Sequence, residues 1–351
     1  MKKTSNTGIV SLLLATGLLV HVSCTPGVDR TAEDLPTKID VILDTDANNE
    51  VDDQHAIAYM LFNGNYFNVE GITVNSTSVP SGFDYEPHVD HHYEEAKRVM
   101  QLCGELYGII PLKAGATDSF EEIRTSLDDP EYDGHEAVDF MIEQAMKERD
   151  DELVIIAIGK LTNVALAVKK EPRITSNIRV YWLGANYPEP GEHNLYWDIP
   201  SMNYLLDSDV PFEMVLVRYW EPSGTAAVIA TQDEILHRMP GKGPQISEPV
   251  IGRHGGEFYN WGDYSANLFE TYYMHFDPPG RSMFDMAAVA IVKNPEWAER
   301  SMIPAPIYDE ENERWIDRDD NPREIAIWEW FDIYGIMNDF FQTMRDPVLA
   351  R

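Results

Sequence analysis

Cysteine is scarce in this chain, which has only Cys24 and Cys103 among its 351 residues. Two cysteines cannot supply the disulfide framework that stabilises many small exported domains. If Cys24 is modified, as considered below, Cys103 has no partner left. Cys103 follows the apolar stretch Val99–Leu102, and we predict that it is a core residue.

Basic residues are also few, with 27 Lys and Arg against 60 Asp and Glu, so that the net charge is −33. Such a surface repels nucleic acid and anionic membranes, which argues against both as partners. A small neutral or cationic substrate is compatible with this charge, and so is a metal held by clustered carboxylates. Hydrophobic residues make up 44% of the chain and aromatic residues 11%, which excludes a disordered protein and allows one large core.

Long apolar runs are absent, and Ile9–Val20 spans only about a dozen residues, too few for a membrane-spanning helix. With Lys2 and Lys3 before it, this run is typical of a secretory signal. Val22-Ser23-Cys24 resembles a bacterial lipobox, although His21 stands where leucine is usual. We predict a signal peptide over 1–24 with Cys24 acylated, or alternatively an ordinary signal peptide, and a tether over 25–37. The protein would then be exported and lipid-anchored in the cell envelope, on its periplasmic or surface face.

Beyond the tether, apolar runs of strand length alternate with helical patterns. The predicted strands are 41–43, 69–74, 153–158, 178–183 and 212–217, and the predicted helices are 56–62, 93–106, 134–147 and one from 163. This order predicts an α/β fold with a mainly parallel central sheet and helices on both faces, in one domain over 38–351. From residue 218 the pattern loosens, with a loop at 240–244 and a lid at 253–264. We expect a C-terminal cap that includes a helix over 325–344.

A dense acidic cluster joins the first predicted strand to its helix. Ten residues carry five carboxylates, namely Asp44, Asp46, Glu50, Asp52 and Asp53. Like charges at such density are unfavourable unless a cation neutralises them, and Ca²⁺ suits oxygen ligands of this kind. An EF-hand loop fails on spacing, because Asn49 stands at its glycine position and His55 at its final glutamate. An acidic helix start would explain only the last two aspartates. The cluster therefore predicts a metal site.

The cluster also resembles a family signature. Asp44-x-Asp46 followed by Asp52-Asp53 and an apolar helix is similar to that of the inosine–uridine-preferring nucleoside hydrolases, with five residues instead of three between Asp46 and Asp52. Further segments resemble that family in the same order over roughly residues 38 to 295: Gly71–Val74, Ile158–Asn163, Asn186, Glu192–Asn194, Asp198 and Phe284–Val289. Within them, His193 stands where the family has phenylalanine, and Phe284 replaces a histidine.

The resemblance implies hydrolysis of the N-glycosidic bond of ribonucleosides by a calcium-activated water, releasing free base and ribose. The implied metal ligands are the side chains of Asp46, Asp53 and Asp285 and the backbone carbonyl of Ile158. Asp46 would also be the general base, and Asp44 would support the loop. The implied substrate contacts are Asp52 and Asn194 to the ribose 2′- and 3′-hydroxyls, Asn186 and Glu192 to the 5′-hydroxyl, and either Asn75 or Ser78 to the ribose.

Phe284 leaves the proton donor for the departing base open. His254 or Asp263 could protonate the base, and Trp261 or Tyr264 could stack on it and favour a purine. The alternative is that these are surface residues or aromatics packed in the lid. His193 could shape the 5′ side of the pocket or simply pack. The three histidines at positions 88, 91 and 92 either bind a transition metal or form an exposed helix start, and we expect the latter.

Three functions remain open from the sequence. The first is an envelope-anchored enzyme that acts on scavenged nucleosides. The second is a calcium-dependent nucleoside- or ribose-binding lipoprotein without catalysis, which the loss of the histidine at Phe284 favours. The third is a hydrolase of another N-riboside. A homo-oligomer is compatible with each of them.

Overall fold

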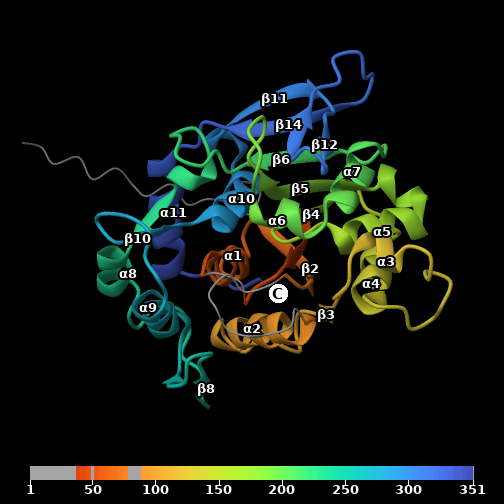
Figure 1. Cartoon of the computed structure of the whole chain (residues 1–351). Coiled ribbons are helices and arrows are strands. Elements are labelled where there is room, and N and C mark those ends of the chain that lie inside the picture. Colours follow the sequence, from red (N-terminus) through yellow and green to blue (C-terminus); the bar gives the residue numbers. More distant parts are fainter. Residues whose placement is uncertain (1–36, 49–50, 78–87, 351) are drawn as a thin grey trace, which may run out of the picture. The chain divides into compact units, whose positions relative to one another are not determined.

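The centre of the fold is an eight-stranded sheet with the strand order β11-β14-β6-β5-β4-β1-β2-β3 (Figure 1). A computed structural model describes residues 37–48, 51–77 and 88–350, within one compact unit over 36–351. The strands are β1 Ile39–Thr45, β2 Phe67–Val74, β3 Leu112–Ala114, β4 Leu153–Ala157, β5 Ile178–Ala185, β6 Phe212–Leu216, β11 Glu299–Pro304 and β14 Glu324–Glu329. All neighbouring pairs from β3 to β14 are parallel, and only β11 is antiparallel to its neighbour. The predicted α/β class with a mainly parallel sheet is therefore confirmed.

Helices cover both faces because successive side chains of a strand point to opposite sides. In β1, Val41 and Leu43 belong to one core cluster, and Ile42 belongs to the other. The first cluster packs against α1 Asp52–Leu61, α2 Val89–Leu102, α9 Trp261–Thr271, α10 Phe284–Lys293 and α11 Ile333–Arg345. The second packs against α3 Phe120–Ile123, α4 His135–Ala145, α5 Thr162–Lys170 and α7 Ile199–Leu206 (Figure 1). Cys103 is fully buried in the first cluster, as predicted.

The connections reverse direction at the middle of the sheet. The chain proceeds outward from β1 to β2 and β3, then returns to β4 on the other side of β1 and continues to β5 and β6. In open parallel sheets, ligands bind beyond the carboxyl ends of the strands at such a reversal. The acidic loop after β1 and the Ile158–Asn163 turn after β4 lie at this point.

The later part of the chain differs from its prediction. Residues 324–329 form strand β14 instead of the start of a helix, and Ala326 pairs with Glu213 of β6. The prediction failed because a short apolar run buried on both faces lacks the periodicity that separates strand from helix. The predicted lid at 253–264 consists of a turn, one strand of a small hairpin and the first turn of α9.

The remaining elements are short. They are α6 His193–Trp197, α8 Gln232–Arg238, β7 Ile229–Thr231, β8 Val250–Ile251, β9 Glu257–Phe258, β10 Gly280–Ser282, β12 Ile307–Asp309, β13 Arg314–Ile316 and 3₁₀ turns at Pro172–Ser176, Thr225–Ala227 and Pro295–Trp297. Within the described ranges, no helix has the length and apolar character needed to cross a bilayer.

Candidate active site

A small cavity of about 50 Å³ lies at the carboxyl ends of the central strands, and we call it the acidic cavity. Its space suits an ion with a few waters. It is lined by Asp46, Asp52, Asp53, Ile158, Leu183, Glu192, His193, Asn194, Tyr219, Phe284 and Asp285. Residues from six separate segments of the chain thus meet in one cavity.

Two helix N-termini supply its central carboxylates. Asp52 and Asp53 occupy the first turn of α1, and Asp285 occupies the first turn of α10. Carboxylate oxygens of these three residues all lie within 4.8 Å of one another. The backbone N–H of Asp285 also points at Oδ2 of Asp52, at 3.4 Å. The positive ends of both helix dipoles therefore face the carboxylates and partly offset their charge.

The electrostatics of these carboxylates fit a cation. Burial raises the pKa of Asp52 to about 6, and it raises the pKa values of Asp53 and Asp285 well above the ordinary range. Repulsion from neighbouring aspartates raises the pKa values of Asp53 and Asp285 further. Buried carboxylates this close cannot all be ionised alone, and a divalent cation bound among them restores their ionised forms. The donor set consists of oxygens only, which suits a hard cation.

Asp44 lies behind the cavity and has a full set of hydrogen bonds. Its Oδ1 accepts from Thr73 Oγ1 at 2.7 Å and from Asn163 Nδ2 at 2.8 Å, and its Oδ2 accepts from Asn75 Nδ2 at 2.9 Å. These bonds join the ends of β1 and β2 to the start of α5. Burial raises the pKa of Asp44 to about 6. The geometry therefore suits the supporting role expected for this residue.

Asp46 and Asn75 approach each other beside Gly159. A Cβ atom at position 159 would lie 2.7 Å from Asn75 Oδ1 and 3.0 Å from Asp46 Oδ1, so any larger residue there would have to displace these two side chains. Asn75 Oδ1 is buried and has no hydrogen-bond partner among the described residues. A hydroxyl donor from a ligand would satisfy this atom. Ser78, the alternative to Asn75, lies outside the described residues.

Ile158, Asn194 and Glu192 form the opposite wall. Asn194 Nδ2 donates to the carbonyl oxygens of Ile158 at 3.1 Å and of Leu183 at 3.0 Å. The Ile158 carbonyl retains a second lone pair for a cation. Burial raises the pKa of Glu192 to about 8, and its Oε2 accepts from Leu195 N at 3.0 Å.

Asn186 does not line the acidic cavity. Its Oδ1 accepts from the backbone N–H of Tyr219 at 3.0 Å, and its Nδ2 donates to Pro190 O at 3.1 Å. Asn186 therefore holds Tyr219, which does line the cavity and which the sequence analysis missed. Tyr219 follows the end of β6, so the rule that ligands bind beyond strand ends could have identified it.

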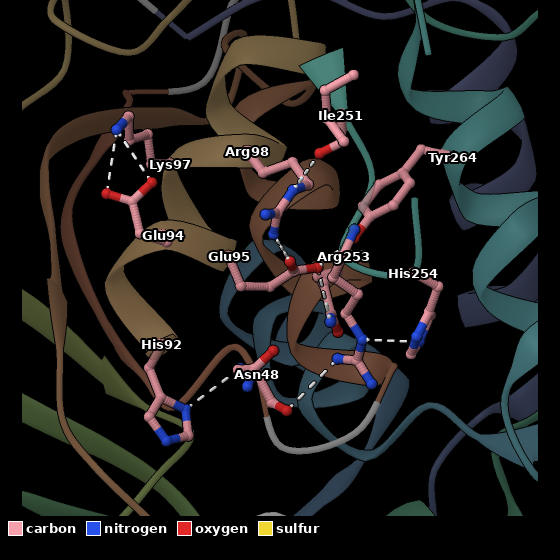
Figure 2. Close-up of polar contacts among 11 residues, drawn as sticks. Asn48, His92, Glu94, Glu95, Lys97, Arg98, Ile251, Arg253, His254 and Tyr264 are labelled. Carbon is pink, nitrogen blue, oxygen red and sulfur yellow. Dashed lines mark hydrogen bonds and ion pairs between the residues drawn. The ribbon is translucent and has the colours of Figure 1, made fainter. Parts of the chain in front are cut away.

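The residues proposed for the leaving group lie elsewhere. Trp261 is fully buried and packs edge-on against His55, with ring centroids 5.1 Å apart. Asp263 accepts from Asn260 Nδ2 and Gly241 N. His254 lies beside Arg253 (Figure 2), and Tyr264 Oη donates to Glu95 Oε1 at 2.6 Å. None of the four predicted residues lines the acidic cavity, because the chain between 253 and 264 packs against α2 and the core.

Two histidines lie close to the acidic residues of the site, and the sequence analysis anticipated a pocket position only for His193. His92 is buried, contrary to the exposed helix start expected, and its ring nitrogens lie 2.7 Å from Asp46 O and 2.9 Å from Thr77 O. It thus connects the loops that follow β1 and β2. His193 lines the acidic cavity, and its buried Nε2 has no hydrogen-bond partner among the described residues. Burial lowers the pKa of His193, which favours the neutral form of the ring.

Sequence comparison identifies the family. The family model described as "Inosine-uridine preferring nucleoside hydrolase" matches residues 41–324. An uncharacterised protein of Schizosaccharomyces pombe is 34% identical over 118 residues, which are 32% of this chain and 38% of that protein. "Probable uridine nucleosidase 1" of Oryza sativa subsp. japonica is 26% identical over 114 residues, 30% of this chain and 33% of that protein. The chain thus matches only about a third of the length of each of these two relatives.

Solved structures share the fold over a greater length. A plant nucleoside hydrolase has a TM-score of 0.64 and 17% identity, covering 89% of this chain and 100% of its own. A purine-preferring ribonucleoside hydrolase from Gardnerella vaginalis has a TM-score of 0.62 and 21% identity, and the match covers 87% of this chain and 98% of that protein. The chain belongs to the inosine–uridine-preferring nucleoside hydrolase family.

Proposed function

We propose that this protein hydrolyses the N-glycosidic bond of ribonucleosides at the acidic cavity with the help of Ca²⁺. The observation that carries the proposal is the convergence of Asp52, Asp53 and Asp285, whose carboxylate oxygens lie within 4.8 Å of one another although Asp53 and Asp285 are 232 positions apart in the sequence. Family membership supplies the reaction class, and the buried acceptor at Asn75 supplies a place for a ribose hydroxyl.

The residues would have three roles, which are to bind the cation, to bind the ribose and to position Tyr219. Asp46, Asp53, Asp285 and the Ile158 carbonyl would hold the cation, and the position of Asp52 within the same oxygen cluster makes it a further candidate ligand. Asp52, Asn75, Asn194 and Glu192 would hold the ribose hydroxyls, while Asn186 would act indirectly by holding Tyr219. When bound, Ca²⁺ would orient the attacking water and lower its pKa.

The reaction breaks the C1′–N bond, and the bonding electrons leave with the base. Water attacks C1′ and gives one proton to Asp46, while the departing nitrogen takes one proton from solvent or from a donor at the site. Asp46 then returns its proton to solvent, so that nucleoside and water yield ribose and free base. The surrounding carboxylates stabilise the positive charge that develops on the sugar in the transition state.

The decisive experiment incubates the full chain with inosine, uridine and adenosine and measures reducing sugar, with and without a chelator and with Ca²⁺ restored afterwards. We expect release that chelation abolishes and Ca²⁺ restores. Asp53→Ala should lose Ca²⁺ binding in calorimetry and lose turnover together. Full activity of Asp53→Ala in chelator would contradict the metal site.

Phe284 favours a second candidate function. It lines the cavity where other members of the family have a histidine, so the chain could bind a nucleoside or ribose with Ca²⁺ and not cleave it. Tight calorimetric binding of inosine with no sugar released at any pH would establish this function and exclude the enzyme.

A further inference from the structure

A second cavity adjoins the acidic cavity and shares two of its walls. It has a volume of about 390 Å³, and we call it the aromatic cavity. Tyr219 and Phe284 line both cavities, with ring centroids 6.0 Å apart and ring planes at 80°. A ligand whose sugar occupies the acidic cavity therefore meets this pair of rings before it reaches the aromatic cavity.

The lining of the aromatic cavity suits a planar apolar group. Aromatic rings come from Tyr219, Trp220, Phe276 and Phe284, and aliphatic surface comes from Ala226, Ala227 and Ile229. The polar groups of the lining are Arg281, His275, Glu221 and Ser282, and the Arg281 side chain is almost fully buried. Mainly apolar walls with a few polar groups, in a volume of several hundred Å³, are typical of small-molecule sites.

The walls are held rigidly in place. Strands β7 and β10 pair antiparallel beneath the cavity, and Ser282 Oγ donates to Ala226 O at 2.7 Å. Tyr219 is fixed by Asn186 through its backbone, and it lies between two residues with left-handed backbone, Arg218 at φ 48° and Trp220 at φ 66°. Such a conformation is rare for these residues and persists only when the surrounding structure imposes it. Trp220 is 91% exposed, so an apolar ring at the mouth of the cavity faces solvent.

We propose that the aromatic cavity receives the leaving group of the substrate and selects ribosides of fused two-ring bases over those of single-ring bases. The proposal rests on the proposed function and names its substrate class. A two-ring base buries more apolar surface against these walls than a pyrimidine does, and it offers a larger face for stacking. Tyr219 and Phe284 would contact the substrate at the junction of sugar and base.

Filling the cavity from its far wall tests this selection. Ala227→Phe places a ring in the aromatic cavity without altering any residue of the acidic cavity. We expect kcat/KM for inosine to fall by about tenfold or more, while kcat/KM for uridine changes less than about twofold. Ala298→Phe is the control, because Ala298 is partly exposed and lines neither cavity. An unchanged inosine-to-uridine ratio in a folded Ala227→Phe protein would overturn the proposal and leave the proposed function standing.

A binding measurement separates the two proposals if no nucleoside is hydrolysed or Ala227→Phe fails to fold. Hypoxanthine, added to the calcium-loaded full chain, should quench tryptophan fluorescence through contact with Trp220, and Trp220→Phe should remove most of that quenching. Equal quenching in Trp220→Phe, or none in the wild type, would overturn the aromatic cavity as a base site. If no nucleoside is hydrolysed but the quenching depends on Trp220, the proposed hydrolase activity is contradicted and the aromatic cavity stands as a base site.

Discussion

At the scale of single residues, two buried polar atoms near the acidic cavity have no hydrogen-bond partner among the described residues, which is consistent with a ligand bound there. Asn75 Oδ1 and His193 Nε2 are two such atoms, and both residues lie beside Asp46 or in the cavity that it lines. Leaving a buried polar atom unpaired costs about 1–3 kcal/mol, and a ligand that bonds these two atoms would remove that cost. Asn75 faces the proposed ribose, and His193 is a candidate donor to the departing base in place of the histidine missing at Phe284.

We predict that His193→Phe slows the hydrolysis of inosine by on the order of 100-fold, because the departing base loses a hydrogen-bond donor. With p-nitrophenyl riboside, whose leaving group departs without a proton, the same variant should change kcat less than about threefold. Steady-state kinetics on both substrates provides the measurement. Equal losses on the two substrates would show that His193 acts on the sugar instead.

At the scale of elements, strand ends and helix starts deliver every group of the acidic cavity. The loops after β1, β4 and β5 meet the first turns of α1 and α10, and Asp198 holds α7 and the start of α3 in place behind them. Asp198 accepts hydrogen bonds from Phe120 N at 2.8 Å and from Ser201 N at 3.2 Å. The turn between β4 and α5 is closely packed, because a Cβ atom at Gly159 would lie within 3.0 Å of side-chain atoms of both Asn75 and Asp46.

We therefore predict that Gly159→Ala separates the β4–α5 turn from the ends of β1 and β2. The added methyl group meets two buried side chains at 2.7 and 3.0 Å, well inside van der Waals contact. kcat/KM should fall by at least about tenfold, and Ca²⁺ affinity in calorimetry should weaken, since overpacking costs roughly 1–3 kcal/mol. Circular dichroism checks that the variant is folded. Unchanged calcium affinity and turnover would show that the turn does not position Asp46.

At the scale of the whole molecule, the seven parallel strands bring all their carboxyl ends to one edge of the sheet. β14 continues this arrangement beyond β6, where Arg218 bonds Glu329 at 2.8 Å and so fixes the segment that carries Tyr219. The strongly acidic composition agrees with a neutral substrate and a cation at the site. The predicted signal peptide with Cys24 and all but the last residue of the predicted tether lie outside the described residues, and envelope anchoring remains a prediction.

Cys24→Ala tests that prediction in a bacterial host that processes lipoproteins. The wild type should fractionate with membranes and incorporate labelled palmitate, because acyl chains supply the membrane affinity that the acidic domain lacks. The variant should lose the label and leave the membrane fraction. A wild-type protein that is soluble and unlabelled after export would indicate an ordinary signal peptide.

The sequence by itself determined the features that depend on neighbours along the chain. The strand before Asp44, the helix after Asp53 and the alternation of strands and helices follow from local periodicity, and the density of carboxylates between them indicates a cation. The helix wrongly predicted over 325–332 shows the limit of such local patterns. A short apolar run that is buried on both faces has no hydrophobic period that separates a strand from a helix. The spacing and order of the sequence motifs, from Asp44 to the segment that contains Asp285, indicated the family to which the chain belongs.

Only the tertiary structure decided which distant residues meet. Asp285 joins Asp53 because α1 and α10 start side by side, and Tyr219 enters the cavity because Asn186 holds its backbone. His254 and Tyr264 carry suitable chemistry, yet His254 lies beside Arg253 and Tyr264 bonds Glu95 of α2 (Figure 2), and neither residue lines the cavity. Residue type indicates what a side chain can do, whereas its distance from the reacting bond depends on long-range packing that no local pattern encodes.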